Sequence, residues 1–232
     1  MSSAVDFARQ NQSRFLEELK GLLRIPSIST LPEHNGDTRR AAETLAAEMT
    51  RIGLEKVRLI ETAHGGNAGH PLVYGEWLHA TGKPTVLCYG HYDVQPPDPL
   101  DEWRTPPFDP TERNGNLYAR GAVDDKGQMY MHLKALESLF QAGAGKLPLN
   151  VRVILEGEEE VGGEGIANFV REHPEELKGL LRIPSISTLP EHNGDTRRAA
   201  ETLAAEMTRI GLEKVRLIET SHGGSAGHPL VY

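Results

Sequence analysis

Three groups of histidine and carboxylate residues stand out in this 232-residue chain as side chains that could do chemistry. His91 and Asp93 directly follow an apolar run at 85–89, and Asp124 and Asp125 form a second group. The third group is the acidic stretch 156–164, which holds five glutamates in nine residues. Imidazole nitrogen together with carboxylate oxygen is a ligand set that suits zinc, manganese or cobalt. These residue types therefore indicate metal-assisted chemistry.

The spacing of the first group suits a metal ligand and the residue that orients it. His91 and Asp93 are two residues apart, so they share a face if the chain is extended. His91 would bind a cation through one ring nitrogen, and Asp93 would hold the proton on the other. The alternative is a turn histidine followed by a capping aspartate. Asp124 and Asp125 could likewise be no more than an N-cap and a first-turn acid of the helix that follows.

The acidic stretch lies between an apolar run and a Gly-Gly turn, whereas a run of charges is usually a solvated face. Mutual repulsion among the glutamates would raise at least one carboxyl pKa unless cations neutralised them. A metal ligand beside a general base would resolve this conflict, because the base would then stand next to an activated water.

The elements that must position these groups are expected to alternate between helix and strand. Asp37 is expected to cap the second helix and Gly53 to end it. The continuous apolar runs at 85–89 and 149–155 predict central, buried strands. This alternation predicts a layered α/β sheet, in which ligand sites lie at the carboxyl ends of strands. The expected helices are 5–23, 38–52, 126–142 and 164–172, and the expected strands are 56–60, 72–78, 85–89 and 149–155.

Composition excludes several classes of partner. Lys and Arg number 25 against 33 Asp and Glu, a net charge of −8 that repels phosphate backbones and disfavours nucleic acid. No apolar run is long enough to span a bilayer, and the first residues lack an apolar signal core, so we expect no membrane partner and a cytoplasmic location. A single cysteine, Cys88, excludes an internal disulfide and a cysteine-based zinc site.

Four motifs resemble the M20 family of dinuclear metallopeptidases, and within it the dipeptidase or carnosinase-like branch. The motifs are GHYDVQP at 90–96, DEWRTPPFDP at 101–110, LYARGAVDDKGQ at 117–128 and EGEEEVGGEG at 156–165. Family members hydrolyse dipeptides or N-acyl amino acids, which implies a small-molecule substrate and the fold of the M20 catalytic domain.

The resemblance also implies a role for each matching residue. His91 would ligate one metal, Glu160 would ligate the other, and Asp124 would bridge both, followed by a cis peptide bond to Asp125. The catalytic candidates are Glu159, as the general base that takes a proton from water, and Asp93, as the orienter of His91. The cofactor would be one or two divalent ions, zinc or manganese.

The chain also departs from the family pattern. Only three of the five protein ligands of the family have visible counterparts, and its lid or dimerisation domain has none. His222 and His228 are candidates to replace the lost ligands, because neighbouring glycines give their loop conformational freedom.

A near-identical duplication accounts for the departure. Residues 17–74 recur as 175–232, and only two of the 58 positions differ: Ala63 corresponds to Ser221, and Asn67 to Ser225. We therefore expect 1–174 to be a partial M20-like catalytic domain and 175–232 a second copy of 17–74. The copy could complete the sheet, exchange into another chain, or stay unpacked and aggregate. We expect association between chains, a homo-oligomer by domain swapping, because an identical sequence fits the original position.

The function predicted from the sequence is a metal-dependent hydrolase that uses an activated water. Without a lid its site would be open, so esters and phosphotriesters are expected as substrates besides amides. The alternative is a catalytically dead recombinant fragment that folds and self-associates.

Overall fold

The computed structural model describes residues 3–64 and 66–173, together with twelve scattered residues between 197 and 231. The chain divides into two compact units, Met1–Phe169 and Val170–Tyr232. Within the described residues, no helix is long and apolar enough to cross a membrane.

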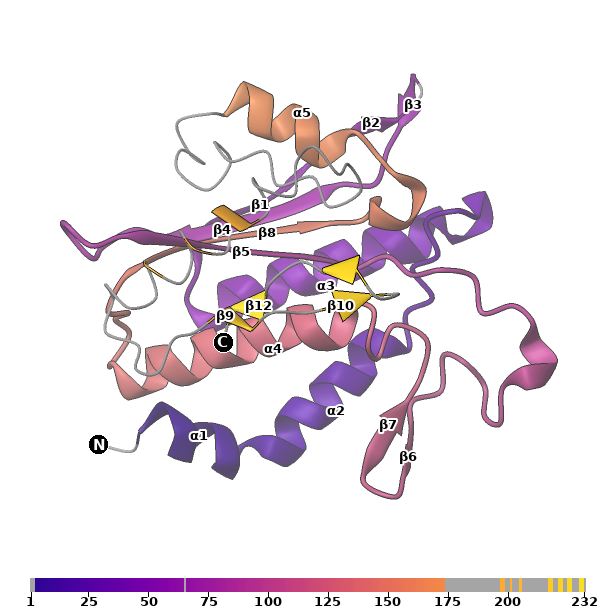
Figure 1. Ribbon diagram of the computed structural model, residues 1–232, viewed down its shortest axis with the longest axis horizontal. Helices are drawn as coiled ribbons and strands as arrows, with labels where there is room; N and C mark the ends of the chain where they lie inside the picture. The colour runs from indigo at the N-terminus through magenta and orange to yellow at the C-terminus, as the bar shows by residue number, and fades with distance from the viewer. Residues whose placement is uncertain are drawn as a thin grey trace. The chain divides into compact units, whose positions relative to one another are not determined.

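The first unit is built on a four-stranded mixed sheet (Figure 1). Strand β8 pairs in parallel with β5 and antiparallel with β4, which in turn pairs antiparallel with β1. Helices pack on this sheet, so the predicted α/β class is confirmed. The strand order across the sheet is β1 (Glu55–Ile60), β4 (Leu72–Trp77), β8 (Asn150–Glu156) and β5 (Thr85–His91).

The prediction of two central strands is right for β8 and wrong for β5. β8 lies between two neighbours, and its last four residues are buried. β5 pairs only with β8 among the described residues, and its Val86 and Tyr89 side chains are 37% and 46% exposed. An apolar run reports a preference for burial, but it does not say how many neighbours a strand has.

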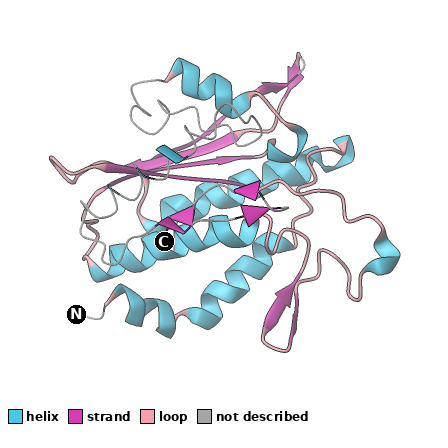
Figure 2. Ribbon diagram, viewed as in Figure 1, coloured by secondary structure: helices cyan, strands magenta, loops and turns pink. Residues whose placement is uncertain are grey.

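On one face of the sheet, α3 and α4 pack against the strands, and α1 and α2 pack on α4 (Figures 1 and 2). The helix expected at 5–23 is broken at Asn11, whose side chain donates to the Phe7 carbonyl at 2.9 Å. On the other face, Phe169 of α5 packs against the ring of Tyr74. The helices are α1 (Ala4–Gln10), α2 (Gln12–Leu23), α3 (Asn35–Ile52), α4 (Lys126–Ala142) and α5 (Gly165–Glu172).

The predicted cap of α3 is wrong, whereas its predicted end is confirmed. α3 begins at Asn35 with His34 in the N-cap position, and Asp37 lies in the first turn, 2.7 Å from the His34 Nδ1 atom. Gly53 ends the helix with a φ of 109°, a left-handed conformation that glycine adopts at no steric cost.

Shorter elements connect these parts. The two-residue strands β2 (Ala63–His64) and β3 (Asn67–Ala68) form a small hairpin, where a loop is expected from the sequence. A second hairpin projects from the region after β5 (Figure 1). The remaining elements are η1 (Pro32–His34), η2 (Leu100–Glu102), β6 (Thr111–Arg113), β7 (Asn116–Tyr118) and η3 (Glu159–Val161).

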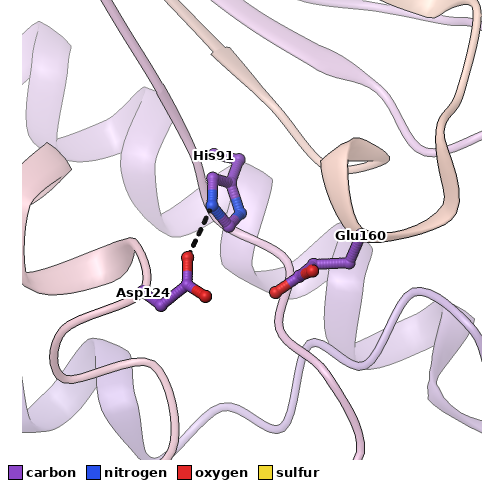
Figure 3. A group of neighbouring side chains, drawn as sticks. All are labelled: His91, Asp124 and Glu160. Atoms are coloured by element: carbon purple, nitrogen blue, oxygen red, sulfur yellow. Dashed lines mark hydrogen bonds and ion pairs between the residues drawn. The ribbon is translucent and has the colours of Figure 1, made fainter. Parts of the chain in front are cut away.

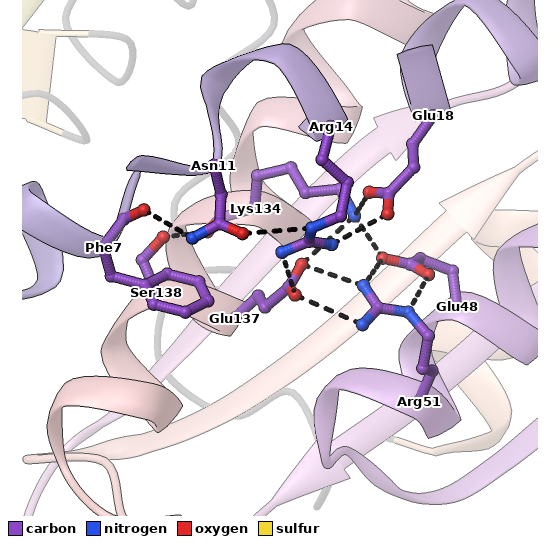
Figure 4. Close-up of polar contacts among 9 residues, drawn as sticks. All are labelled: Phe7, Asn11, Arg14, Glu18, Glu48, Arg51, Lys134, Glu137 and Ser138. Atoms are coloured by element: carbon purple, nitrogen blue, oxygen red, sulfur yellow. Dashed lines mark hydrogen bonds and ion pairs between the residues drawn. The ribbon is translucent and has the colours of Figure 1, made fainter. Parts of the chain in front are cut away.

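A buried ion-pair network joins α2 and α3 to α4 beside the apolar core (Figure 4). The ammonium of Lys134 lies 2.5 Å from Glu18 and 3.2 Å from Glu137 and also contacts Glu48, while Arg51 binds Glu137 at 2.9 Å. Three carboxylates here are close enough to share a metal ion, but lysine and arginine already neutralise them. We therefore interpret this cluster as structural.

The described part of the second copy repeats the pairing of the first. β9 (Leu217–Ile218) pairs with β12 (Leu230–Val231) in the register that Leu59 and Ile60 have with Leu72 and Val73. β10 (Ser221–His222) and β11 (Ser225–Ala226) likewise pair as β2 and β3 do. The duplication also predicts a second copy of the helix expected at 38–52, at 196–210, and most of this range lies outside the described residues.

Candidate metal centre

The parallel pairing of β5 with β8 brings two of the predicted groups to one edge of the sheet. β5 ends at His91 and β8 ends at Glu156, and these two residues are paired in register. The Tyr92 amide then donates to the Glu156 carbonyl at 2.8 Å, so the segments that follow β5 and β8 begin side by side. The acidic stretch therefore leaves the sheet beside His91, as expected for a site at the carboxyl ends of strands.

Three side chains from three segments converge at this edge (Figure 3). The His91 Nε2 atom lies 3.1 Å from Asp124 Oδ1. One ligand atom each from His91, Asp124 and Glu160 lies within 4.8 Å of the others. His91 ends β5, Asp124 lies in the loop before α4, and Glu160 lies in η3, so the fold brings together residues far apart in sequence.

Asp93 is fully buried directly behind His91. One of its carboxylate oxygens accepts from the Ser29 hydroxyl at 2.6 Å and from the Glu160 amide at 3.1 Å. Its other oxygen lies 3.3 Å from His91 Nδ1 and accepts no hydrogen bond within the described residues, whereas the Asp93 backbone carbonyl is hydrogen-bonded to this Nδ1 atom at 3.2 Å. Asp93 thus contacts the backbone of one candidate ligand and faces the ring of another.

The two aspartates of the second group lie in different environments. The peptide bond that joins them is cis, as the family resemblance implies. The Asp124 side chain is 72% exposed, whereas the Asp125 carboxylate accepts from the His91 amide at 3.2 Å. Asp125 occupies the N-cap position of α4 but makes no capping hydrogen bond. Asp125 therefore lies at the cap position that the alternative expects, but its carboxylate contacts the backbone of His91 instead of capping the helix.

The five glutamates of the acidic stretch separate into distinct surroundings. Glu156 is buried and accepts from the Tyr89 hydroxyl. Glu158 is buried and accepts from the His70 amide at 3.0 Å, which fastens the loop before β4. The Glu160 carboxylate accepts from Gln95 at 2.7 Å. The remaining two, Glu159 and Glu164, are exposed.

The pKa values of His91 and of Glu156 are both raised beside the neighbouring carboxylates, and both shifts reduce the net negative charge of the site. Burial lowers the pKa of His91, but Asp93, with Glu159 and Asp125, outweighs burial and raises this pKa to about 9. Burial raises the pKa of Glu156, and the nearby carboxylates add to this effect. These shifts agree with the repulsion expected from the sequence and indicate a site suited to a cation.

Sequence reasoning missed Ser29, Gln95 and Tyr89. Ser29 reaches Asp93 because Ile28 forms a parallel β-bridge with Val94, and no local pattern signals this contact between residues 64 apart. Gln95 lies inside the GHYDVQP motif, so its position in that motif was the available signal.

The proposed replacement ligands lie in the second unit. The backbone of His222 is in β10, and His228 lies outside the described residues. Their use as ligands stays a prediction.

Comparison with known proteins identifies the class to which this fold and cluster correspond. The peptidase family M20/M25/M40 matches residues 87–224, so the chain belongs to this family. The cysteinylglycine-S-conjugate dipeptidase of Corynebacterium striatum is 34% identical over 166 residues, covering 71% of this chain and 35% of that protein. The Cys-Gly metallodipeptidase dug1 of Schizosaccharomyces pombe is 31% identical over 171 residues, covering 72% and 36%.

The crystal structure of human carnosine dipeptidase 1 superimposes with a TM-score of 0.67 at 31% identity, covering 73% of this chain and 37% of that one. This similarity confirms the predicted M20-type fold. The chain spans about a third of the length of the relatives it matches.

The residues present fit a divalent cation. One imidazole nitrogen and the oxygens of two carboxylates converge, and this donor set suits zinc or manganese. Asp93 is fully buried next to His91. In metal sites a carboxylate or carbonyl in this place orients the ligating histidine.

Proposed function

We propose that this chain is a metal-dependent hydrolase that acts on small amide substrates of the dipeptide class. The observation that carries the proposal is the approach of His91, Asp124 and Glu160 to within 4.8 Å at one edge of the sheet. The relatives named above, dipeptidases of Cys-Gly and carnosine, support the substrate class.

In this proposal each residue of the chain has a defined task. His91, Asp124 and Glu160 hold the cation, zinc or manganese, and Asp93 keeps the proton of His91 on Nδ1 so that Nε2 is free to bind. A bound divalent cation would polarise the substrate carbonyl and acidify water. Glu159 is exposed beside Glu160 and takes the proton from the attacking water.

A metal-reconstitution experiment with matched variants tests the proposal. The chelated protein is reloaded with zinc or manganese, metal per chain is measured, and hydrolysis of Cys-Gly and carnosine is followed. We expect Glu159→Gln to lower kcat at least 100-fold while metal content stays unchanged, since one proton acceptor typically contributes 10²–10⁴-fold, as an order of magnitude. Glu164→Gln, an exposed glutamate of the same stretch, is the control. Turnover without metal, or equal effects of both variants, would contradict the proposal.

The substrate range forms a finer part of the proposal. Asp124 is 72% exposed, so the described residues leave this ligand open to solvent and to substrates of varied shape. We therefore expect activated esters and phosphotriesters to be hydrolysed as well as dipeptides. Variants of Glu159 should lower all three activities together if they share one site.

We further propose that residues 175–232 form an interchangeable version of 17–74 that joins chains into domain-swapped oligomers. Every core side chain of the first copy, such as Leu45 and Met49, has an identical counterpart in the second. The two differing positions, Ala63 and Asn67, are exposed in the small β2–β3 hairpin. The first copy also has a neighbour that is not duplicated: Arg14 binds Glu18 of this copy and Glu137 of α4, each at 2.8 Å.

Molar mass in solution distinguishes the outcomes. The full chain should form oligomers, and a chain ending at Glu172 should be monomeric. Arg14→Gln should shift the full chain towards larger assemblies, because the first copy then loses its advantage over the second. If the full chain forms oligomers without metal or turnover, the alternative of an inactive, self-associating fragment is favoured. A monomeric full chain would contradict the exchange.

A further inference from the structure

A cavity of about 520 Å³ lies between the segment around η2 and the β6–β7 hairpin, outside the cluster of candidate metal ligands. Its volume is in the range of small-molecule sites. The side chains of Trp103 and Tyr118 contribute aromatic surface to its lining, and three arginines contribute positive charge. None of these residues belongs to the proposed metal centre.

The three arginines, Arg104, Arg113 and Arg120, make no salt bridge within 4 Å to any described carboxylate. The lining also contains Asp98 and Glu102, so the cavity has an excess of one positive charge. The whole chain has a net charge of −8, so this excess is a local feature of the cavity.

Two of the guanidinium groups are held in place by aromatic rings. Arg113 lies 4.1 Å from the centre of the Tyr118 ring, and Arg120 lies 5.5 Å from that of Trp103. The Trp103 indole donates to the Pro97 carbonyl at 2.7 Å, which fixes the ring. A stacked guanidinium loses little conformational freedom when it binds an anion, because it is already oriented.

These guanidiniums also have unused hydrogen-bonding capacity. The Nε atoms of Arg113 and Arg120 are buried and have no acceptor within the described residues. These buried Nε atoms lie out of reach of a ligand, and Arg120 also donates through Nη2 to the Pro96 carbonyl at 2.9 Å. Arg104 and Arg113, which line the cavity, therefore supply most of the donors left for an anion. The planar guanidinium donates two parallel hydrogen bonds to a carboxylate.

We propose that this cavity binds a small organic monoanion, a carboxylate attached to an aromatic or apolar group. The carboxylate accepts from the arginines, and the attached group packs on the ring of Tyr118, which is 40% exposed. A single excess positive charge matches a monoanion better than a phosphate dianion. This binding needs no metal, so it does not depend on the proposed hydrolase activity.

A matched pair of ligands tests the proposal on the full-length, chelator-treated chain. N-acetylphenylalanine and its amide differ only in the carboxylate, and calorimetric titration measures the affinity of each. We expect the acid to bind at least tenfold more tightly than the amide, and added salt to weaken the acid selectively. Arg113→Gln should weaken binding of the acid at least tenfold. Arg9→Gln, at an exposed position of α1, should have no effect.

Each contrary result overturns the proposal. Equal affinity for acid and amide would show that no carboxylate is recognised, and this comparison needs no variant to fold. Stronger competition by inorganic phosphate than by N-acetylphenylalanine would assign the cavity to a different anion class. Unchanged binding in Arg113→Gln, with an unchanged circular dichroism spectrum, would place the ligand elsewhere.

Discussion

Replacing Asp93 by asparagine changes two atoms at a fully buried position, and the structure predicts its effect on metal affinity. One carboxylate oxygen accepts from both Ser29 and the Glu160 amide, so the single oxygen of asparagine must occupy that place. The new amide NH₂ then faces His91 Nδ1, where the other carboxylate oxygen lies 3.3 Å away. Two donors would then face each other, and only the Asp93 carbonyl, 3.2 Å from Nδ1, remains as an acceptor there. The balance of imidazole tautomers therefore moves towards the one with its proton on Nε2, the atom that faces Asp124.

The expected magnitude follows from this change of tautomer. Loss of the partner that orients a metal-binding histidine lowers affinity by roughly 10–100-fold. At 25 °C this factor corresponds to about 1.4–2.7 kcal/mol of binding free energy. The loss of one negative charge beside the cation acts in the same direction. We therefore expect Asp93→Asn to weaken zinc binding within this range without unfolding the chain.

Competition with a fluorescent zinc chelator measures this affinity. Asp109→Asn, at an exposed position, is the control for a general loss of negative charge. His91→Ala sets the scale for complete loss of the ligand. If Asp93→Asn bound zinc as tightly as the unaltered chain while His91→Ala did not, the orienting role of Asp93 would be refuted.

Three further changes should alter the free energy of unfolding, measured by urea denaturation. Lys126 is fully buried and donates to two carbonyls at the end of α2, so Lys126→Met should cost about 1–3 kcal/mol, and no loss would contradict this role. Burial opposes ionisation of Glu137, but hydrogen bonds led by Arg51 lower its pKa to about 2. Its contribution to the free energy of unfolding is therefore present above pH 4.5 and lost as pH falls towards 2, by up to about 1.4 kcal/mol per pH unit. Glu137→Gln should flatten this dependence of stability on pH. A Cβ atom on Gly157 would lie 2.5 Å from the buried Tyr92 ring, so Gly157→Ala should cost about 1–3 kcal/mol, and an unchanged urea midpoint would show that the ring can move.

The residues that meet at the candidate site could be predicted because the ends of apolar runs mark the ends of strands in the sequence. His91 follows one apolar run and the acidic stretch follows another, and parallel neighbours place such ends at one edge of a sheet. The helix that follows Asp124 and Asp125 was also visible, from its apolar periodicity. The approach of the Asp93 carboxylate to His91 could be expected from their separation by two residues, but the hydrogen bond from Ser29 to Asp93 could not.

What the sequence could not predict depends on contacts made across the fold. The run at 85–89 looks like a central strand, yet β5 has one partner among the described residues. The break at Asn11 arises because α1 and α2 both pack on α4, and an apolar stripe continues through a bend without marking it. Asp37 resembles an N-cap, but an additional turn, η1, lies before it and lets α3 begin three residues earlier than expected, at Asn35.

The position of Lys126 explains why the chain alone leaves the site negative. Lys126 lies two residues after Asp124, but its side chain turns inward to the Ile25 carbonyl at 2.7 Å, and burial lowers its pKa to about 7. No lysine or arginine forms a salt bridge with Asp93, Asp124 or Glu160 within the described residues. In the α2–α3–α4 network, by contrast, lysine and arginine neutralise a similar group of carboxylates. Among the described residues, the fold therefore balances one acidic cluster with its own lysine and arginine and leaves the other without them, and this contrast supports the distinction between the structural cluster and the proposed metal centre.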